Sequence, residues 1–174
     1  MFSLDQQKCK LAHLNVRSEI HGEEIKTAID LKIEMKVSND ILSEFDPALK
    51  SALYQKPDAA SSQQGELIKD PGHLPSLKFP KLAPIKWGYE GAGYAATVHY
   101  GVSGKDDILL IDTEIDGFRF DCQDGGTVAV IFRVVAHPDA VSIGRLSEMI
   151  QTEISLTLEP PSEEKQLDDL EKAA

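Results

Sequence analysis

The chain has 174 residues, of which 41% are hydrophobic, and it carries a formal net charge of −11 at pH 7. This length supports one hydrophobic core, and the ordered patterning of the apolar residues excludes global disorder. The acidic balance disfavours tight electrostatic binding to duplex DNA, although a local basic groove is compatible with it.

The sequence contains no window near 18 consecutive apolar residues, and its first residues lack a basic region followed by an apolar one. We therefore expect neither a membrane span nor secretion. The two cysteines, Cys9 and Cys122, lie in different segments, and a single disulfide between them stays open. Two thiols in such a chain are more typically free, so we expect a cytoplasmic protein.

The N-terminal part predicts a long antiparallel hairpin. Residues 8–19 are typical of a first strand, with Ala12, Leu14 and Val16 on one face, and residues 21–23 form the turn. In residues 25–37 apolar or β-branched side chains alternate with polar ones, and this period of two indicates a strand with one dry face. That face consists of Ile25, Thr27, Ile29, Leu31, Ile33, Met35 and Val37.

The next segment predicts short helices and then a long connection. Residues 38–40 end the strand and supply N-cap side chains for a turn over 41–45. Asp46 is expected to cap a helix over 47–54, because proline is tolerated at the first helical position. Residues 55–84 hold five of the nine prolines. We expect residues 58–64 to be mobile and the rest to be pinned in extended segments.

Strands resume at Ile85, and Tyr94, Ala96, Val98 and Tyr100 alternate with their neighbours. Residues 106–120 are an extended run whose phase slips at Gly117, which indicates a β-bulge. Residues 124–126 form a tight turn into the near-continuous apolar run 127–136, for which burial on both faces is expected. Asp139 or Ser142 then caps a short helix, and Ile154, Leu156 and Leu158 mark a closing strand.

Together these elements predict a mainly β (β-rich α+β) protein. Hairpin connections dominate and no βαβ alternation is present, so we expect an antiparallel β-sandwich or a partly open barrel with two peripheral helices. Residues 1–160 are interpreted as a single β-rich domain with residues 55–84 as its long proline-rich loop. Residues 161–174 are interpreted as an acidic C-terminal tail.

Catalytic patterns are weak in this sequence. Glu34-Met35-Lys36 has the E-x-K spacing of metal-dependent nucleases, in which a carboxylate binds the metal and a lysine steadies the attacking water. The alternating signs of Asp30, Lys32, Glu34 and Lys36 are better explained by cross-strand pairs on a solvated face. The five histidines show no metal spacing, and no nucleophile motif is present. We therefore expect no enzyme, no catalytic residue, no cofactor and no metal.

Two groups of residues are candidates for binding partners. Aromatic residues close to lysines could stack unpaired bases along a basic track, whereas ordinary core and edge packing is the alternative. This first group is Trp87, Tyr89, Tyr94, Tyr100, Lys78, Lys81 and Lys86. The second group is an acidic row that could take the place of phosphates on a partner, or serve only as a solvated face. It consists of Asp106, Asp107, Asp112, Glu114 and Asp116.

Three segments carry a resemblance to known proteins. They are N-D-I-L-S-E-F-D-P-A-L-K-S-A-L-Y from Asn39, G-E-L-I-K-D-P-G-H-L-P-S-L-K-F-P from Gly65, and W-G-Y-E-G-A-G-Y from Trp87. Together they resemble a family of uncharacterised phage and prophage proteins over most of residues 8–158. The resemblance implies a virus-encoded protein of the bacterial cytoplasm, often from the early or recombination genes, and it assigns no active-site residue.

These observations lead to two main hypotheses. The first is a non-enzymatic accessory protein of phage DNA replication or recombination that binds single-stranded DNA, or proteins of those processes, with the aromatic and lysine group. The alternative is an acidic inhibitor that uses the acidic row to occupy a host nuclease or another nucleic-acid enzyme of a defence complex. A virion structural protein is a distant third. The sequence leaves the oligomeric state open, including a homo-oligomer.

Overall fold

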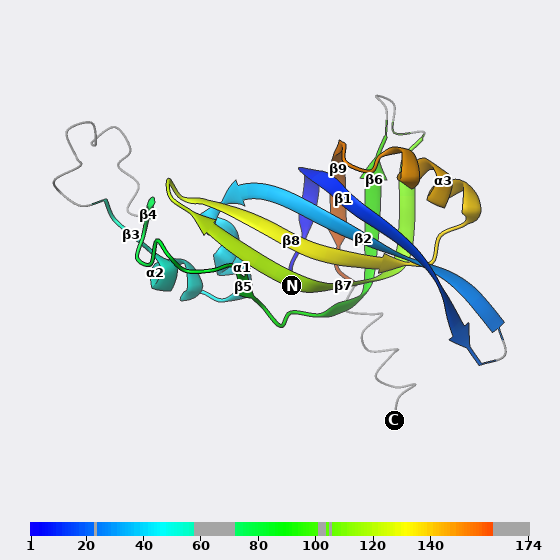
Figure 1. Cartoon of the computed structure of the whole chain (residues 1–174), viewed down its shortest axis with the longest axis horizontal. Helices are drawn as coiled ribbons and strands as arrows, with labels where there is room; N and C mark the ends of the chain where they lie inside the picture. The colour runs from blue at the N-terminus through cyan, green and yellow to red at the C-terminus, as the bar shows by residue number, and fades with distance from the viewer. Residues whose placement is uncertain (23, 58–71, 101–103, 105, 162–174) are drawn as a thin grey trace. The chain divides into compact units, whose positions relative to one another are not determined.

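Strands form most of the chain in the computed structural model, which describes residues 1–22, 24–57, 72–100, 104 and 106–161 (Figure 1). The strands within this part are β1 (Leu4–His21), β2 (Glu24–Ser38), β3 (Tyr54–Gln55), β4 (Ser76–Leu77), β5 (Ile85–Lys86), β6 (Gly91–His99), β7 (Ile108–Gln123), β8 (Thr127–Ala136) and β9 (Glu153–Glu159). The helices are a 3-10 turn (Asn39–Ile41), α1 (Leu42–Phe45), α2 (Leu49–Leu53) and α3 (Ala140–Glu148). No helix in the described ranges is long and apolar enough to cross a membrane.

The main sheet closes on itself. Its strand order is β5-β7-β6-β9-β1-β2-β8, and β8 also pairs with β7, so six antiparallel strands form a closed barrel. β5 pairs with the end of β7 that β6 does not reach, through Ile85 opposite Phe120. The predicted β-rich antiparallel class is confirmed. Closure of the ring selects a barrel over a sandwich, and the barrel is not partly open as the sequence suggested.

The chain divides into two compact units, each described by itself below. The first unit comprises the described residues within Met1–Met35, Gly88–Phe118 and Ile131–Ala174. The second unit comprises those within Lys36–Trp87 and Arg119–Val130.

The predicted N-terminal hairpin is present in the first unit. β1 and β2 pair antiparallel up to His21 opposite Glu24, and Gly22, which follows His21, has a φ of 66°. The predicted dry face of β2 is buried at Ile29, Leu31, Ile33 and Met35. Ile25, at the outer end of the same face, is instead exposed, because the hairpin continues beyond the core.

The predicted inner face of β1 needs correction. Ala12 is buried, but Leu14 is only half-buried and Val16 is exposed, whereas Cys9 and Leu11 are buried. A register shift between Leu11 and His13 moves the phase of the strand by one residue. Since side chains alternate between the two faces of a strand, such a bulge exchanges the odd-numbered and even-numbered residues between the buried and the exposed face.

An aromatic cluster lies at the centre of the first unit. Phe118 stacks on Phe132 with ring centroids 5.2 Å apart, and the edge of Phe2 meets Phe118 at 5.2 Å. The side chain of Phe2 is fully buried although it precedes the first strand. Such edge and stacked contacts stabilise a core beyond the area that they bury.

Two bulges set the faces of β7. Gly117 has a φ of 67°, and Ile115 and Phe118 on either side of it are both buried, as the predicted slip requires. A second irregularity at Asp112, with a φ of 54°, was not predicted. It places Thr113 in the core, where its hydroxyl donates to the Tyr94 carbonyl at 3.1 Å.

β8 has the predicted bounds but not the predicted burial. Val128, Val130, Phe132 and Val134 are buried, whereas Arg133 is exposed. Most of β8 therefore buries one face only, and burial on successive residues is confined to its last three positions, residues 134–136.

The second unit begins with the predicted end of β2. The Ser38 hydroxyl accepts a hydrogen bond from the Asp40 amide, and the Asp46 carboxylate caps the following turn by accepting from the Ala48 amide at 2.7 Å. α2 is shorter than the predicted helix 47–54 at both ends: it begins at Leu49, after an N-cap position at Ala48 that has no side-chain cap bond, and it ends at Leu53 because Tyr54 begins β3. The predicted mobile stretch 58–64 lies outside the described residues.

The described part of the long loop is extended and anchored within the second unit. β4 pairs with β3, and the Pro75 carbonyl accepts a hydrogen bond from the Gly125 amide at 2.8 Å. The buried Asn39 side chain donates to the Leu74 carbonyl at 2.8 Å. The bond to Leu74 satisfies the buried Asn39 amide, and together these bonds hold residues 74–77, as expected for the described part of the loop's second half.

The chain closes in the first unit with α3 and β9. The Asp139 carboxylate caps α3 by accepting from the Ser142 amide at 2.7 Å, which selects Asp139 from the two predicted caps. β9 buries Ile154, Leu156 and Leu158, as predicted. The predicted acidic tail lies almost entirely outside the described residues, since these end at Pro161.

Candidate functional site

The aromatic and lysine group is divided between the two units. Lys78, Lys81, Lys86 and Trp87 belong to the second unit, whereas Tyr89, Tyr94 and Tyr100 belong to the first. The structure therefore does not establish a single continuous track from these seven residues.

Tyr94 is a core residue. Only 1% of its surface is exposed, so it cannot stack on a base in this structure. Its hydroxyl is 2.8 Å from the hydroxyl of Tyr89, which also accepts a hydrogen bond from the Phe2 amide at 3.2 Å. Burial, together with the bond to Tyr89, raises the pKa of the Tyr94 hydroxyl above its ordinary value.

Tyr89 and Tyr100 differ in their freedom to bind. The ring of Tyr89 meets the edge of Phe118 at 5.5 Å and is half-buried, so it contributes to the aromatic cluster. Tyr100 is exposed, and its amide donates to the Asp107 carboxylate at 3.0 Å. Ordinary packing therefore explains two of the three tyrosines.

In the second unit, residues 78–87 run from the end of β4 through β5, and we call this segment the cationic strap. No Asp or Glu occurs between Asp70 and Glu90 in the sequence. The amide of Lys78 donates to the Leu53 carbonyl at 2.9 Å and its ammonium donates to the Ser51 carbonyl at 2.5 Å. These bonds fix the beginning of the strap while leaving the charge of Lys78 without a described carboxylate partner.

Apolar side chains of the strap face solvent. The Phe79 side chain is 58% exposed, and Leu82 nearby is also exposed. A turn joins them, since the Leu82 amide donates to the Phe79 carbonyl at 3.0 Å. Phe79 was not among the predicted binding residues, although its position between Lys78 and Lys81 was a readable signal.

Like charges oppose each other where the strap joins β7. Lys86 and Arg119 are direct cross-strand partners, and both side chains are exposed. Within the described ranges, neither has an ion pair with a carboxylate. Like charges placed directly opposite destabilise a sheet, so this pair favours an anion as a ligand. Arg119 was missed because only the pairing of β5 with β7 brings it to the strap.

Trp87 follows this pair and is half-buried. Its ring lies 6.3 Å from the ring of Phe120, which in turn packs against Phe45 at 4.8 Å. Trp87 therefore anchors the end of the strap and presents only part of its ring to solvent. It is the single tryptophan of the chain.

The acidic row lies in the first unit, and its charges are mostly compensated. The guanidinium of Arg133 binds Asp116 through two hydrogen bonds of 2.7 and 2.5 Å. Asp106 lies 3.9 Å from the guanidinium of Arg145. Asp107 accepts a hydrogen bond from His99, which leaves Asp112 and Glu114 as the carboxylates of the row without a described partner.

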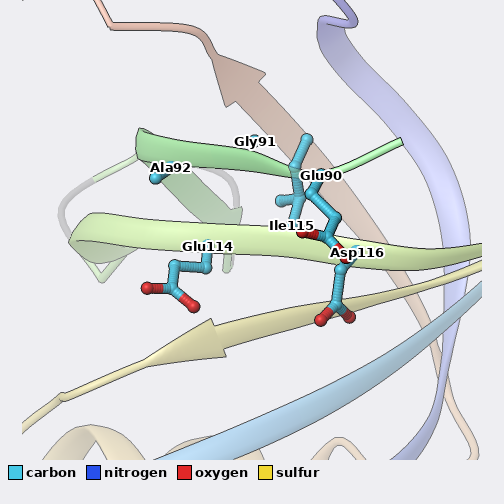
Figure 2. A pocket seen from close by; sticks show the side chains of 6 residues that line it. All are labelled: Glu90, Gly91, Ala92, Glu114, Ile115 and Asp116. Carbon is cyan, nitrogen blue, oxygen red and sulfur yellow. The ribbon is translucent and has the colours of Figure 1, made fainter. Parts of the chain in front are cut away.

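A shallow pocket of about 260 Å³ adjoins this row. It is lined by Glu90, Gly91, Ala92, Glu114, Ile115 and Asp116. Figure 2 shows the side chains of Glu114 and Asp116 pointing to the same side of β7. Within the described ranges no three His, Cys, Asp or Glu side chains are arranged to hold a metal ion.

A three-residue hydrogen-bond relay was not predicted. One ring nitrogen of His99 lies 2.7 Å from the Asp107 carboxylate, and the other lies 2.8 Å from the Thr157 hydroxyl. That hydroxyl also accepts from the Gln6 amide at 3.0 Å. The three groups come from β6, from the residue before β7 and from β9, so no local sequence pattern could reveal them. Their mutual bonds join these strands, and no pocket with a place for a substrate is described beside them.

The weak catalytic patterns have structural explanations. Asp30 accepts a hydrogen bond from Arg17 at 3.1 Å across the hairpin, and Lys32 lies 3.3 Å from Glu34 on the same face. Cys9 and Cys122 are both unpaired thiols. Burial, with a smaller contribution from Glu153, raises the pKa of Cys9 to about 12, which makes it a poor nucleophile at neutral pH.

No protein-family model, curated protein or solved structure matches this chain. The functional argument therefore depends on the geometry of the two units.

Proposed function

We propose that this chain is a non-enzymatic, phage-type accessory protein of DNA replication or recombination that binds single-stranded DNA with the cationic strap and Arg119. The observation that carries the proposal is the exposed, uncompensated pair of Lys86 and Arg119 at the end of an acid-free segment. Phosphate oxygens are the natural counter-charges for such a pair.

The aromatic side chains favour single strands over other polyanions. Phe79 is exposed beside Lys78 and Lys81, so it offers a stacking surface next to positive charge. A base in a duplex has both faces occupied by its neighbours, whereas an unpaired base can stack on an aromatic ring. This revises the predicted residue set: Tyr89, Tyr94 and Tyr100, which belong to the first unit, are left out, and Phe79 and Arg119 are added.

The proposal is tested by titrating the chain with a fluorescently labelled oligothymidylate at low salt. Phe79→Ala should weaken binding by about 1 kcal/mol or more, the typical contribution of one base–aromatic stack. Polyphosphate provides the matched comparison because it has no bases, and its affinity should be unchanged by Phe79→Ala. Absence of oligonucleotide binding at low salt would refute the proposal.

The acidic inhibitor is the second candidate, and one observation favours it. Asp112 and Glu114 are exposed side chains without described partners, and Glu114 lines the pocket with Glu90 and Asp116. This candidate ranks below the first because three of the five carboxylates of the row are already paired. It predicts co-purification with a host nucleic-acid enzyme that is lost in Asp112→Asn/Glu114→Gln but kept in Asp5→Asn/Glu24→Gln, a pair of exposed acids on β1 and β2.

A further inference from the structure

One edge of β1 is open along the outer half of the hairpin, as far as the structure describes the chain. β1 pairs with β9 only from Leu4 to Lys10, and with β2 from Lys10 to His21. On the side of β1 that faces β9, the last backbone bonds beyond Lys10 join Leu11 to residues 151 and 152. Within the described ranges, residues 13–21 therefore have a strand partner on one side only.

The register shows which backbone groups point away from β2. The amide and the carbonyl of Leu11 both bond residues 151–152, so Leu11 and Ile33, which lie opposite each other, are not a hydrogen-bonded pair. Bonding direction alternates along a strand, so the even-numbered residues of β2 from Lys32 to Glu24 face β1 and bond the residues opposite them. The amides and carbonyls of Val16, Ser18 and Ile20 therefore point to the open edge. Leu11 is odd-numbered and also bonds away from β2, whereas these three residues are even-numbered. The register shift between Leu11 and His13 accounts for this change.

The same stretch exposes an apolar face. Val16 is 49% exposed, Ile20 is 79% exposed, and Ile25 directly opposite Ile20 is 75% exposed. Val16 lies opposite the buried Ile29, so this surface continues the core-facing side of the hairpin. Figure 1 shows the end of the β1–β2 hairpin extending past α3, the helix of the same unit.

This edge lacks the usual protection against strand pairing. Natural edge strands carry proline, lysine or a covering segment, which prevent the addition of another strand. Residues 13–21 contain neither proline nor lysine. The single arginine, Arg17, points to the other face, where it is bound by Asp30 and Glu19.

We propose that this open edge pairs antiparallel with the same edge of a second copy, about a two-fold axis at Ser18. In this register Val16 lies opposite Ile20 of the second copy, and Arg17 lies opposite Glu19 of the second copy. The reverse pairs form by symmetry, as in any isologous interface. The edge is therefore self-complementary in both charge and apolar face.

Other nearby registers fail. Centring the axis on Arg17 or Glu19 places two like charges directly opposite each other. A register centred between two residues sets the apolar face of one copy beside the charged face of the other. Pairing at Ser18 joins two hairpins into a four-stranded sheet and places the six exposed aliphatic side chains of the two copies side by side.

The primary test is sedimentation velocity of the full chain over a range of concentrations. The wild type should form a dimer, and Ser18→Pro should raise the dissociation constant roughly tenfold or more, because it removes the central outward amide of each copy. Ser18→Ala keeps that amide and should dimerise as the wild type does. A wild type that stays monomeric, or a Ser18→Pro dimer of unchanged affinity, overturns the proposal.

Charge exchange tests the register separately. Arg17→Glu alone and Glu19→Arg alone each place like charges opposite each other in a homodimer, so each should be monomeric. A mixture of the two variant chains restores opposite charges at both positions and should form a heterodimer. Circular dichroism establishes that each variant is folded. Failure of two folded variants to associate when mixed, or homodimers of wild-type affinity, overturns the register.

Discussion

Replacing both opposed cations of the strap, with Lys86→Ala/Arg119→Ala, should reduce the salt dependence of oligonucleotide binding by about half. The strap and its partner strand offer four cations without described carboxylate partners, namely Lys78, Lys81, Lys86 and Arg119. Each phosphate neutralised on a single strand contributes about 0.7 to the slope of log K against log salt. Four contacts give a slope of about −2.8, and the double variant should give about −1.4.

These slopes correspond to clearly different losses of affinity. Between about 50 and 200 mM salt, the wild type should lose about 50-fold and the double variant about 7-fold. The assay is fluorescence anisotropy of a labelled oligothymidylate, with the emission of Trp87, beside Lys86, as a second signal. The control, Lys10→Ala/Lys26→Ala, removes the same charge from exposed positions on β1 and β2 and should keep the wild-type slope. A double strap variant with the wild-type slope would refute the reasoning.

Three further predictions follow from buried or paired groups. Tyr94→Phe should lower the free energy of unfolding by about 1 kcal/mol, because it leaves the Tyr89 hydroxyl with one partner fewer; a urea midpoint equal to the wild type would contradict this. The hydrogen bond from the Tyr100 amide, and to a smaller extent the one from His99, lowers the pKa of Asp107 in the folded chain. The ionised Asp107 therefore stabilises the fold fully above the unfolded-state pKa near 3.9, and this stabilisation is lost as the pH falls through the lower folded-state pKa. When the pH is lowered below about 4, Asp107→Asn should therefore lose less stability than the wild type does. Identical dependence of the urea midpoint on pH in the two proteins would argue against this linkage. Cys9, with a pKa near 12, should resist thiol reagents at pH 8 until the chain unfolds, and rapid labelling of native Cys9 would be inconsistent with its burial.

Much of the architecture was predictable because local patterns and the final packing agree. The alternation of apolar and polar residues over 25–37 correctly predicted which side chains of β2 are buried at its inner end. Gly125 and Gly126, both at positive φ, form the turn between β7 and β8 at the expected position. The cap at Asp139 was readable for the same reason, since one short-range hydrogen bond satisfies an otherwise unpaired amide. Barrel closure was not predictable, because it depends on pairing between strands distant in sequence, namely β2 with β8, β6 with β9, and β9 with β1.

The site was predicted less well, for reasons visible in particular residues. Tyr94 alternates in phase with Ala96 and Val98, so its burial could have been inferred from its own strand. Asp112 is different, since a non-glycine residue at positive φ carries no clear sequence mark. Arg119 could not be assigned to the strap from sequence, because its neighbour Lys86 is set by strand register.

The proposed binding of DNA to the strap depends on local charge and not on the total. The net charge of −11 disfavours nucleic acid only over distances that salt does not screen. At physiological ionic strength the Debye length is about 8 Å, so a phosphate at Lys86 responds mainly to Arg119 and the neighbouring lysines. At about 10 mM salt the screening length is near 30 Å, and repulsion from the acidic residues elsewhere reaches the ligand. Affinity should therefore rise less steeply below about 50 mM salt than the slope at higher salt implies, and a constant slope down to about 10 mM would contradict this argument.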